Sequence, residues 1–190
     1  MKTVISIFIL AAMMACGDNN NNKDPKKEAM EANKDAAKDN EVKKDMKDDM
    51  NFAVKAADDG MLEVALGQLA QQKGMSADIK ELGKHMVDDH TTANNELKAL
   101  AATKGITLPA GMSKDAQDKY DDLSKKSGTD FDEAYGKAMV KDHEDAIDLF
   151  QKESDKGEDP ELKSWAAGKL STLQHHKQMA EACCEKMDKK

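Results

Sequence analysis

Residues 76–105 read SADIKELGKHMVDDHTTANNELKALAATKG, and this stretch carries the clearest structural signal in the chain. Ser76 is a favoured residue at the start of a helix, and Gly105 is a favoured residue just past its end. Between them, apolar residues recur every three or four positions, which is the period of one helix face. The stripe, which includes one histidine, consists of Ile79, Leu82, Met86, His90, Ala93, Leu97 and Leu100. The stretch therefore predicts a long amphipathic helix with a histidine on its buried face.

Three further stretches show the same spacing, over residues 50–73, 130–156 and 162–187. A shorter amphipathic stretch follows Ser113, and Gly128 ends it. Long helices joined by short links favour an antiparallel bundle, and about 140 residues are enough for one core. We therefore predict an all-α domain over residues 48–190. It is an antiparallel four-helix bundle with a short extra helix between the second and third long helices.

The composition supports a helical fold and argues against several functions. Charged residues make up 35% of the chain and aromatic residues only 4%, so strand-forming residues are scarce. All 29 basic residues are Lys and the net charge is −8, which argues against a nucleic-acid binder. The glycine-rich phosphate loops, the nucleophile elbow and the metalloprotease helix motif are all missing from the sequence. The sequence thus gives no sign of catalysis.

The first 15 residues, MKTVISIFILAAMMA, have the pattern of a secretory signal peptide. The following Ala15-Cys16-Gly17 resembles a bacterial lipobox, in which the cysteine carries the lipid, although Met13 and Met14 depart from the usual pattern. We therefore expect Cys16 to be the lipid attachment site. The alternative is an ordinary cleaved signal followed by an incidental cysteine.

Residues 16–47 are polar and charged, and we expect them to form a flexible tether, whose Ala/Glu/Lys-rich part could form a solvated helix. No Asp follows Cys16, so the inner-membrane retention signal known from other lipoproteins is missing from its usual position. By resemblance to those proteins, we expect a lipid-anchored protein of the cell envelope, at the periplasmic face or the surface of the outer membrane. The membrane, through the lipid, is the expected partner. The sequence leaves a homodimer and further envelope partners open.

Three histidines and a glutamate are the candidate site residues. His90, His143 and His176 each lie on an apolar stripe near the middle of a long helix, and Glu63 lies near the middle of the first one. Mid-helix positions share one layer in an antiparallel bundle, so these four side chains could converge. Such nitrogen and oxygen ligands suit Fe²⁺, Zn²⁺, Cu²⁺ or Ni²⁺. The alternative is a closed network of neutral histidines and Glu63 that is purely structural.

Two of these histidines lie within a repeated sequence pattern. Residues 86–93 and 139–146 share the pattern MVxDHxxA, which we interpret as two sites with similar structural requirements and not as a duplication. Asp89 and Asp142 in this pattern point about 100° away from the histidines that follow them, so we expect them behind the ligands or at the surface. His85 and His175 lie off the apolar stripes. The adjacent Cys183 and Cys184 fit a packed core or a redox or soft-metal site, and the sequence leaves the choice open.

Several motifs resemble a family of exported bacterial proteins catalogued as domain of unknown function four-one-four-two. The resemblance rests on short segments spread over residues 50–187. They are Asn51-Phe52-Ala53, Gly60-Met61-Leu62-Glu63-Val64, Met86-Val87-x-Asp89-His90, Gly105-Ile106-Thr107-Leu108-Pro109, Asp142-His143 and Leu170-x-x-Leu173 before His176. The resemblance implies a ferritin-like four-helix fold. Members of this family are labelled predicted outer membrane proteins, and the family implies no established activity. The family's shared Glu and His positions are those of the candidate layer.

Two functional hypotheses follow. The first is a lipid-anchored envelope protein with a structural, binding or stress-related role and no evident catalysis. The second is a metal-binding bundle that stores, buffers or oxidises a transition metal.

Overall fold

A computed structural model describes residues 23–38 and 46–189, and over these residues the protein is entirely helical. The predicted signal peptide and Cys16 lie outside the described residues. The six described helices are α1 (Pro25–Lys38), α3 (Lys47–Lys73), α4 (Ala77–Lys104), α5 (Lys114–Ser124), α6 (Gly128–Lys156) and α7 (Pro160–Asp188). Four of them are 27 to 29 residues long and therefore extend for about 40 Å each. Within the described residues, no helix has the length and apolar content needed to traverse a bilayer.

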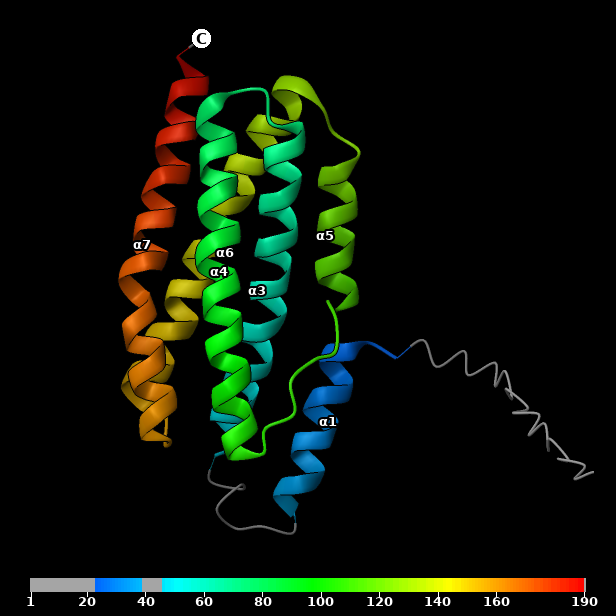
Figure 1. Cartoon of the computed structure of the whole chain (residues 1–190), viewed down its shortest axis with the longest axis vertical. Helices are drawn as coiled ribbons and strands as arrows, with labels where there is room; N and C mark the ends of the chain where they lie inside the picture. Colours follow the sequence, from blue (N-terminus) through cyan, green and yellow to red (C-terminus); the bar gives the residue numbers. More distant parts are fainter. Residues whose placement is uncertain (1–22, 39–45, 190) are drawn as a thin grey trace, which may run out of the picture.

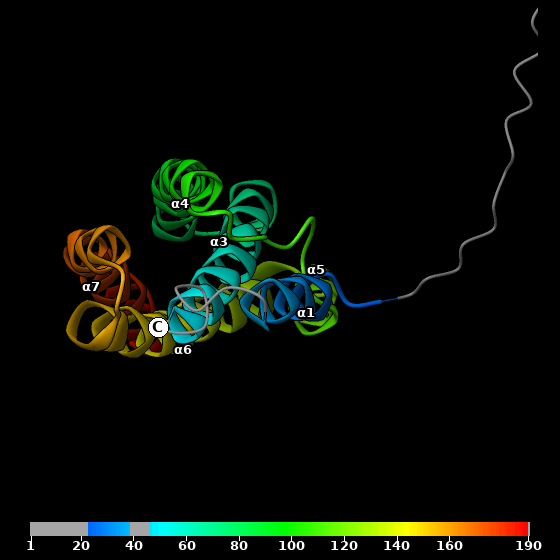
Figure 2. The ribbon, with the colours of Figure 1, turned by 90° about the horizontal axis from the view of Figure 1, so that it is seen from below.

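The four long helices pack side by side as two pairs (Figures 1 and 2). α3 packs along α4, and α6 packs along α7, while further contacts join α4 to α7 and α3 to α6. The buried apolar residues fall into two clusters, one toward each end of these helices. One cluster contains Leu66, Leu82, Phe131 and Met139, and the other contains Phe52, Leu97, Phe150 and Leu162. The candidate histidines lie between the two clusters in sequence on each helix.

The observed helix ends agree with the capping signals in the sequence. The side chains of Ser76 and Ser113 accept hydrogen bonds from backbone N–H groups in the first turns of α4 and α5. Gly105 follows α4 in the left-handed conformation, with φ of 61°, which a glycine adopts without strain. These local interactions fix where α4 begins and ends and where α5 begins, and hence the height of His90 within the molecule.

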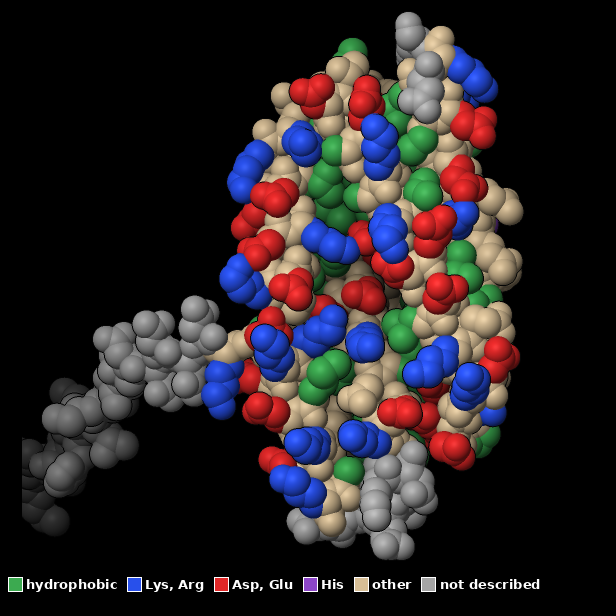
Figure 3. Space-filling model, turned by 180° about the vertical axis from the view of Figure 1, so that it is seen from behind, with side chains coloured by type: hydrophobic (Ala, Val, Ile, Leu, Met, Phe, Trp, Pro, Cys, Tyr) green, Lys and Arg blue, Asp and Glu red, His purple; other side chains and the backbone are tan. Residues whose placement is uncertain are grey.

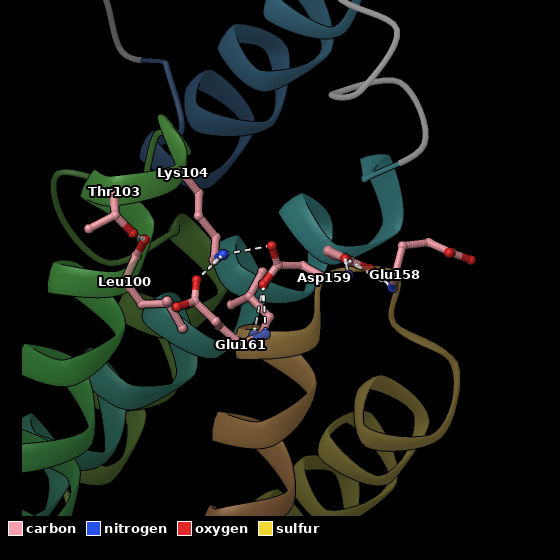
Figure 4. A network of polar contacts seen from close by, with 8 residues as sticks. Leu100, Thr103, Lys104, Glu158, Asp159 and Glu161 are labelled. Atoms are coloured by element: carbon pink, nitrogen blue, oxygen red, sulfur yellow. Dashed lines mark hydrogen bonds and ion pairs between the residues drawn. The ribbon is translucent and has the colours of Figure 1, made fainter.

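A polar network ties the lower ends of three helices together (Figure 4). The Lys104 Nζ atom at the end of α4 donates to Asp159 Oδ2 at 2.6 Å and to Glu161 Oε2 at 2.5 Å. Asp159 also caps α7 by accepting from the backbone N–H groups of Glu161 and Leu162. The backbone N–H groups of Glu158 and Asp159 donate to the carboxylate of Asp49 on α3. One set of charges thus sets the spacing of α3, α4 and α7 at this end.

Two glycines bring α3 and α4 unusually close. A Cβ atom added at Gly67 would lie 2.6 Å from the Gly83 carbonyl oxygen, and one added at Gly83 would lie 2.7 Å from the Gly67 carbonyl oxygen. Both distances are too short for a real methyl group, so only glycine permits this contact. The contact fixes the separation and the lengthwise alignment of the two helices.

The predicted tether differs from the structure in one part. Pro25–Lys38 forms α1, which packs against α3 and buries Ala29, Asn33 and Ala37. The Asn33 side-chain amide exchanges two hydrogen bonds with the backbone of Thr107, at 2.9 and 2.8 Å. α1 and α5 lie on the same side of the molecule, outside the four long helices (Figures 1 and 2). This segment belongs to the folded domain because small residues spaced four apart allow close packing without large apolar side chains.

Candidate metal centre

A cavity of about 260 Å³ lies between the two apolar clusters. Its walls come from α3, α4, α5, α6 and α7. The polar residues among its lining are Asp59, Glu63, Asp89, His90, Thr92, Asn94, Lys119, Asp142, His143, Asp145, Lys169, Thr172 and His176. All four residues predicted as metal ligands therefore line one cavity.

Three of the four predicted ligands form a tight group. His90 on α4, His143 on α6 and His176 on α7 each offer one ring nitrogen, and these nitrogens lie within 4.8 Å of one another. The ring centroids are 5.2 to 5.6 Å apart. His143 and His176 are fully buried, and the Nε2 atom of His90 is buried as well. The structure thus places the histidines of these three helices side by side, and their role as metal ligands stays a prediction.

A chain of polar contacts links the three-histidine group to the surface, from the backbone of α6 to Asp89 on α4. His143 Nδ1 lies 2.8 Å from the Met139 carbonyl oxygen, so this nitrogen carries a proton and donates. The other ring nitrogen, His143 Nε2, lies 3.2 Å from His176 Nδ1. On its far side, His176 Nε2 lies 2.8 Å from a carboxylate oxygen of Asp89. Asp89 thus contacts the histidine of α7 and not its sequence neighbour His90.

Counting protons shows that this chain of contacts is not satisfied by neutral side chains. His143 Nε2 has a lone pair, because the ring proton is on Nδ1. If neutral His176 donates from Nε2 to Asp89, two nitrogen lone pairs face each other at 3.2 Å. If it donates from Nδ1 to His143 instead, a lone pair faces the Asp89 carboxylate. A positive species between the two rings, either an added proton or a metal ion, removes the conflict.

The surroundings disfavour the added proton. Burial lowers the pKa of His176, and Asp89 only partly opposes this effect. Burial and the neighbouring His176 lower the pKa of His143 to about 4. Burial and the two other histidines also hold the pKa of His90 well below its usual value. The three rings are therefore neutral at pH 7 and present lone pairs, which is the form that binds metals.

His90 adds the strongest single sign of a missing partner. Its Nε2 atom is buried and has no hydrogen-bond partner among the described residues. A buried polar atom without a partner costs about 1–3 kcal/mol, so such atoms are rare unless something binds them. Among the described residues, the histidines and Glu63 thus do not satisfy one another without a further partner.

Glu63 lines the cavity but is not part of the three-nitrogen group. It is only 5% exposed, and its Oε2 atom is buried without a partner. Burial raises the pKa of Glu63 well above its usual value, and the carboxylates of Asp142 and Asp59 raise it further. These surroundings favour the protonated form of the carboxyl group, which can donate one hydrogen bond.

The wall of the cavity also carries Lys119 and Asp59, which the sequence did not single out, together with Asp142. Lys119 on α5 donates to Asp142 Oδ1 at 2.6 Å, while the Asp142 Oδ2 atom is buried without a partner. Asp59 on α3 is desolvated by its surroundings and lies near Asp58 and Asp142, so its pKa rises to about 6. These residues come from three helices, and of the three only Asp142 lies in the repeated MVxDHxxA pattern. Figure 3 shows that lysines and acidic side chains are mixed in the same way over one whole face.

The remaining histidines and the cysteine pair lie apart from this site. The rings of His85 and His175 pack against each other, with centroids 6.3 Å apart, and neither lines the cavity. Cys183 is buried in the apolar cluster at the other end of α7. Burial raises its pKa to about 11, which disfavours the thiolate that binds metals. The structure thus favours the packing role for Cys183.

These features define an all-helical protein with a three-histidine cavity between two apolar clusters. The chain belongs to the family described as domain of unknown function (DUF4142), whose sequence model matches residues 28–183. This confirms the family predicted from the sequence motifs. The match begins within α1, in agreement with the packing of that helix on the domain. None of the curated proteins and none of the solved structures matches the chain.

Proposed function

We propose that this protein binds one transition-metal ion through His90, His143 and His176, within a ferritin-like four-helix bundle. The observation that carries the proposal is the unsatisfied set of nitrogens. His90 Nε2 has no partner within residues 23–38 and 46–189, and His143 Nε2 faces His176 Nδ1 at 3.2 Å without the proton that both this contact and the contact to Asp89 would need. A metal ion between the three rings would accept all three lone pairs.

The donor chemistry favours Zn²⁺, Cu²⁺, Ni²⁺ or Fe²⁺, which bind neutral imidazoles. The outer partners have the arrangement typical of metal sites, in which a ligand histidine donates its second N–H to a carbonyl or a carboxylate. Here the Met139 carbonyl oxygen serves His143, and Asp89 serves His176. Three protein ligands leave one position of a tetrahedral ion open, and Glu63 stands in the wall of the cavity that would receive it.

The cellular role that fits these features is metal storage or buffering at the cell envelope, without catalysis. The signal-peptide pattern of residues 1–15 and the lipobox at Cys16 support export and lipid anchoring. The absence of catalytic motifs from the sequence supports a binding role over an enzymatic one.

Metal counting tests the proposal. The full chain, purified in detergent, would be loaded with each of the four ions, dialysed and analysed by elemental mass spectrometry. We expect one ion per chain, and less than about one tenth of that in H90Q, H143Q and H176Q.

The matched control is H175Q, which changes an exposed neighbouring histidine outside the cavity and should retain the full metal content. A wild-type chain that holds none of the four ions after dialysis would overturn the proposal. So would metal that survives in all three ligand variants.

A further inference from the structure

The wall of the central cavity carries more acidic than basic side chains. Its two lysines already have acidic partners, because Lys119 is paired with Asp142 and Lys169 with Glu96. The other acidic residues of the wall are Asp59, Glu63, Asp89 and Asp145. A cavity lined by an excess of one sign of charge attracts ions of the opposite sign. The charges of the wall therefore favour a cation.

Two of the acidic groups hold buried oxygen atoms that lack a partner. Glu63 on α3 is only 5% exposed, and its Oε2 atom has no hydrogen-bond partner among the described residues. The same holds for the Oδ2 atom of Asp142 on α6. Because an ionised carboxylate can only accept hydrogen bonds or bind cations, a cation would satisfy both oxygen atoms at once.

Lys119 on α5 marks the place where these acidic groups meet. Its Nζ atom donates to Asp142 Oδ1 at 2.6 Å, and its charge also interacts with Asp59 and Glu63. Asp59 and Glu63 are four residues apart on α3 and so lie on the same helix face, with Asp59 exposed and Glu63 buried. One ammonium group thus faces three carboxyl groups, which leaves room for a further positive charge.

The spacing of the ligand atoms indicates a hydrated ion. Within the described part of the chain, only the three imidazoles bring three ligand atoms within 4.8 Å of one another. The carboxyl groups therefore stand too far apart to enclose a bare ion together. Mg²⁺ and Mn²⁺ suit carboxylates and water, and Mg²⁺ is usually held by one or two carboxylates while it keeps several water molecules. The cavity volume of about 260 Å³ has room for such an ion, since one water molecule takes about 30 Å³.

We propose that Glu63 and Asp142 bind a hydrated Mg²⁺ or Mn²⁺ ion in the cavity beside the three histidines. Asp59, at the exposed edge of the wall, contacts this ion through water. The ion is distinct from the transition-metal ion of the proposed function and has different ligands, so each site can fail without the other.

The first test is a titration of Mn²⁺ into the zinc-loaded full chain. Nitrogen ligands prefer Zn²⁺ to Mn²⁺, so zinc occupies the histidines and leaves the carboxylates to manganese. Electron paramagnetic resonance measures the free Mn²⁺ that remains. We expect one bound Mn²⁺ per chain, which an excess of Mg²⁺ displaces.

Carboxylate variants locate the ion. E63Q and D142N should each weaken Mn²⁺ binding by at least about tenfold, with an unchanged zinc content, because each removes one charged ligand of the ion. D145N is the matched control. It removes the same charge from the wall of the same cavity, but Asp145 is exposed and paired with Lys141, so the affinity for Mn²⁺ should stay at the wild-type level.

A second test uses Lys119, whose ammonium group competes with the proposed ion. K119Q should tighten Mn²⁺ binding by at least about threefold, because it removes a nearby positive charge and no ligand. Damage to the fold would not produce a gain in affinity. The control is K114Q, since Lys114 lies on the same helix and is exposed and paired with Asp118. An affinity that K119Q leaves unchanged or weakens would overturn the proposal.

The remaining outcomes separate the two metal sites. We expect H143Q to lose zinc and to keep its Mn²⁺. Manganese that is lost in H143Q and retained in E63Q would lie at the histidines, which overturns the carboxylate site. So would loss of zinc in E63Q, because Glu63 would then be a ligand of the first ion. A chain that holds no zinc overturns the histidine site alone, and the same Mn²⁺ titration of that chain still tests the carboxylates.

Discussion

Asp89 is the residue through which the histidine group meets the solvent. Its carboxylate accepts from His176 Nε2 at 2.8 Å and is about half exposed, whereas the histidine is fully buried. Replacement by Asn keeps an oxygen acceptor but removes the charge that makes His176 a better ligand. We predict that D89N lowers the affinity for the metal about 10- to 100-fold, measured by competition with a chelator.

The exposed neighbour Asp88 provides the control, because D88N changes the same net charge without touching a histidine. Equal affinities of D89N and wild type would show that Asp89 is an incidental surface contact.

Glu153 near the end of α6 makes stability depend on pH. One of its carboxylate oxygens is buried without a partner, and burial together with nearby Asp49 raises its pKa to about 7. The folded state thus keeps a proton that the unfolded state releases near pH 4.5. Because the unfolded chain binds fewer protons between these values, the free energy of unfolding falls as pH rises from about 4.5 to 7.

We predict that E153Q, which is neutral at every pH, is more stable than wild type by about 1–2 kcal/mol at pH 8 and gains little at pH 4.5. Denaturant unfolding at both pH values measures this difference. E158Q, at an exposed position nearby, should shift stability by less than about 0.5 kcal/mol. A destabilised E153Q at pH 8 would contradict the assignment.

The sequence located the three histidines because the height of a residue along a helix follows from its number once the helix ends are known. It could not give the rotation of each helix about its axis. Glu63 has the expected mid-helix position, but its carboxyl group interacts with Asp59, Asp142 and Lys119 and is outside the nitrogen group. The contribution of Lys119 to the cavity wall could not be predicted either. It depends on where α5 packs against the long helices, and the sequence carries no signal for that position.

At the scale of the elements, helix ends were predictable from capping residues, whereas α1 was not. Ser76 and Gly105 identified both limits of α4, and Ser113 the start of α5, to within a residue or two. The prediction that Gly128 ends the short helix was wrong, because α5 already ends at Ser124 and Gly128 begins α6. α1 lacks large apolar residues, so its sequence has the composition of a solvated segment. Its buried face is made of alanines and Asn33. How well such small residues pack depends on the shape of the surface that they contact, which the sequence of α1 does not give.

α1 therefore provides a test of how such a helix is held. We predict that N33A, which removes both hydrogen bonds to the Thr107 backbone, lowers the stability of α1 docking by about 1–3 kcal/mol. Hydrogen exchange over residues 25–38 should become faster while the metal content stays at the wild-type level. The control is N95A on the exposed face of α4. Unchanged exchange in N33A would mean that the alanine contacts alone hold the helix.

At the scale of the whole molecule, composition and periodicity were enough to predict the all-helical class. They were not enough to predict the size of the cavity. Two apolar clusters hold the ends of the long helices, and a polar layer separates them. How far the helices stand apart at that layer depends on many side chains at once. A cavity of about 260 Å³ could not be read from residue spacing for this reason.

The membrane attachment that we propose for the whole chain should depend on one residue. We predict that C16S no longer incorporates labelled palmitate and moves from the membrane fraction to the soluble fraction, because it lacks the thiol that would carry the proposed lipid. Fractionation followed by immunoblotting measures this change. C184S, which keeps Cys16, should remain with the membranes, and a C16S protein that does so as well would exclude the lipid anchor.

The contact between Gly67 and Gly83 has a consequence for interpreting variants of this protein. Gly83 precedes His90 by seven residues on α4, so the two share one helix face, two turns apart. A methyl group at Gly83 would meet the Gly67 carbonyl oxygen at 2.7 Å and push α4 away from α3. His90 would move with its helix, although no ligand had been altered. A survey that scores variants only by bound metal would therefore identify Gly83 as a metal ligand. The loss of metal in G83A would instead reflect a larger distance between the backbones of α3 and α4.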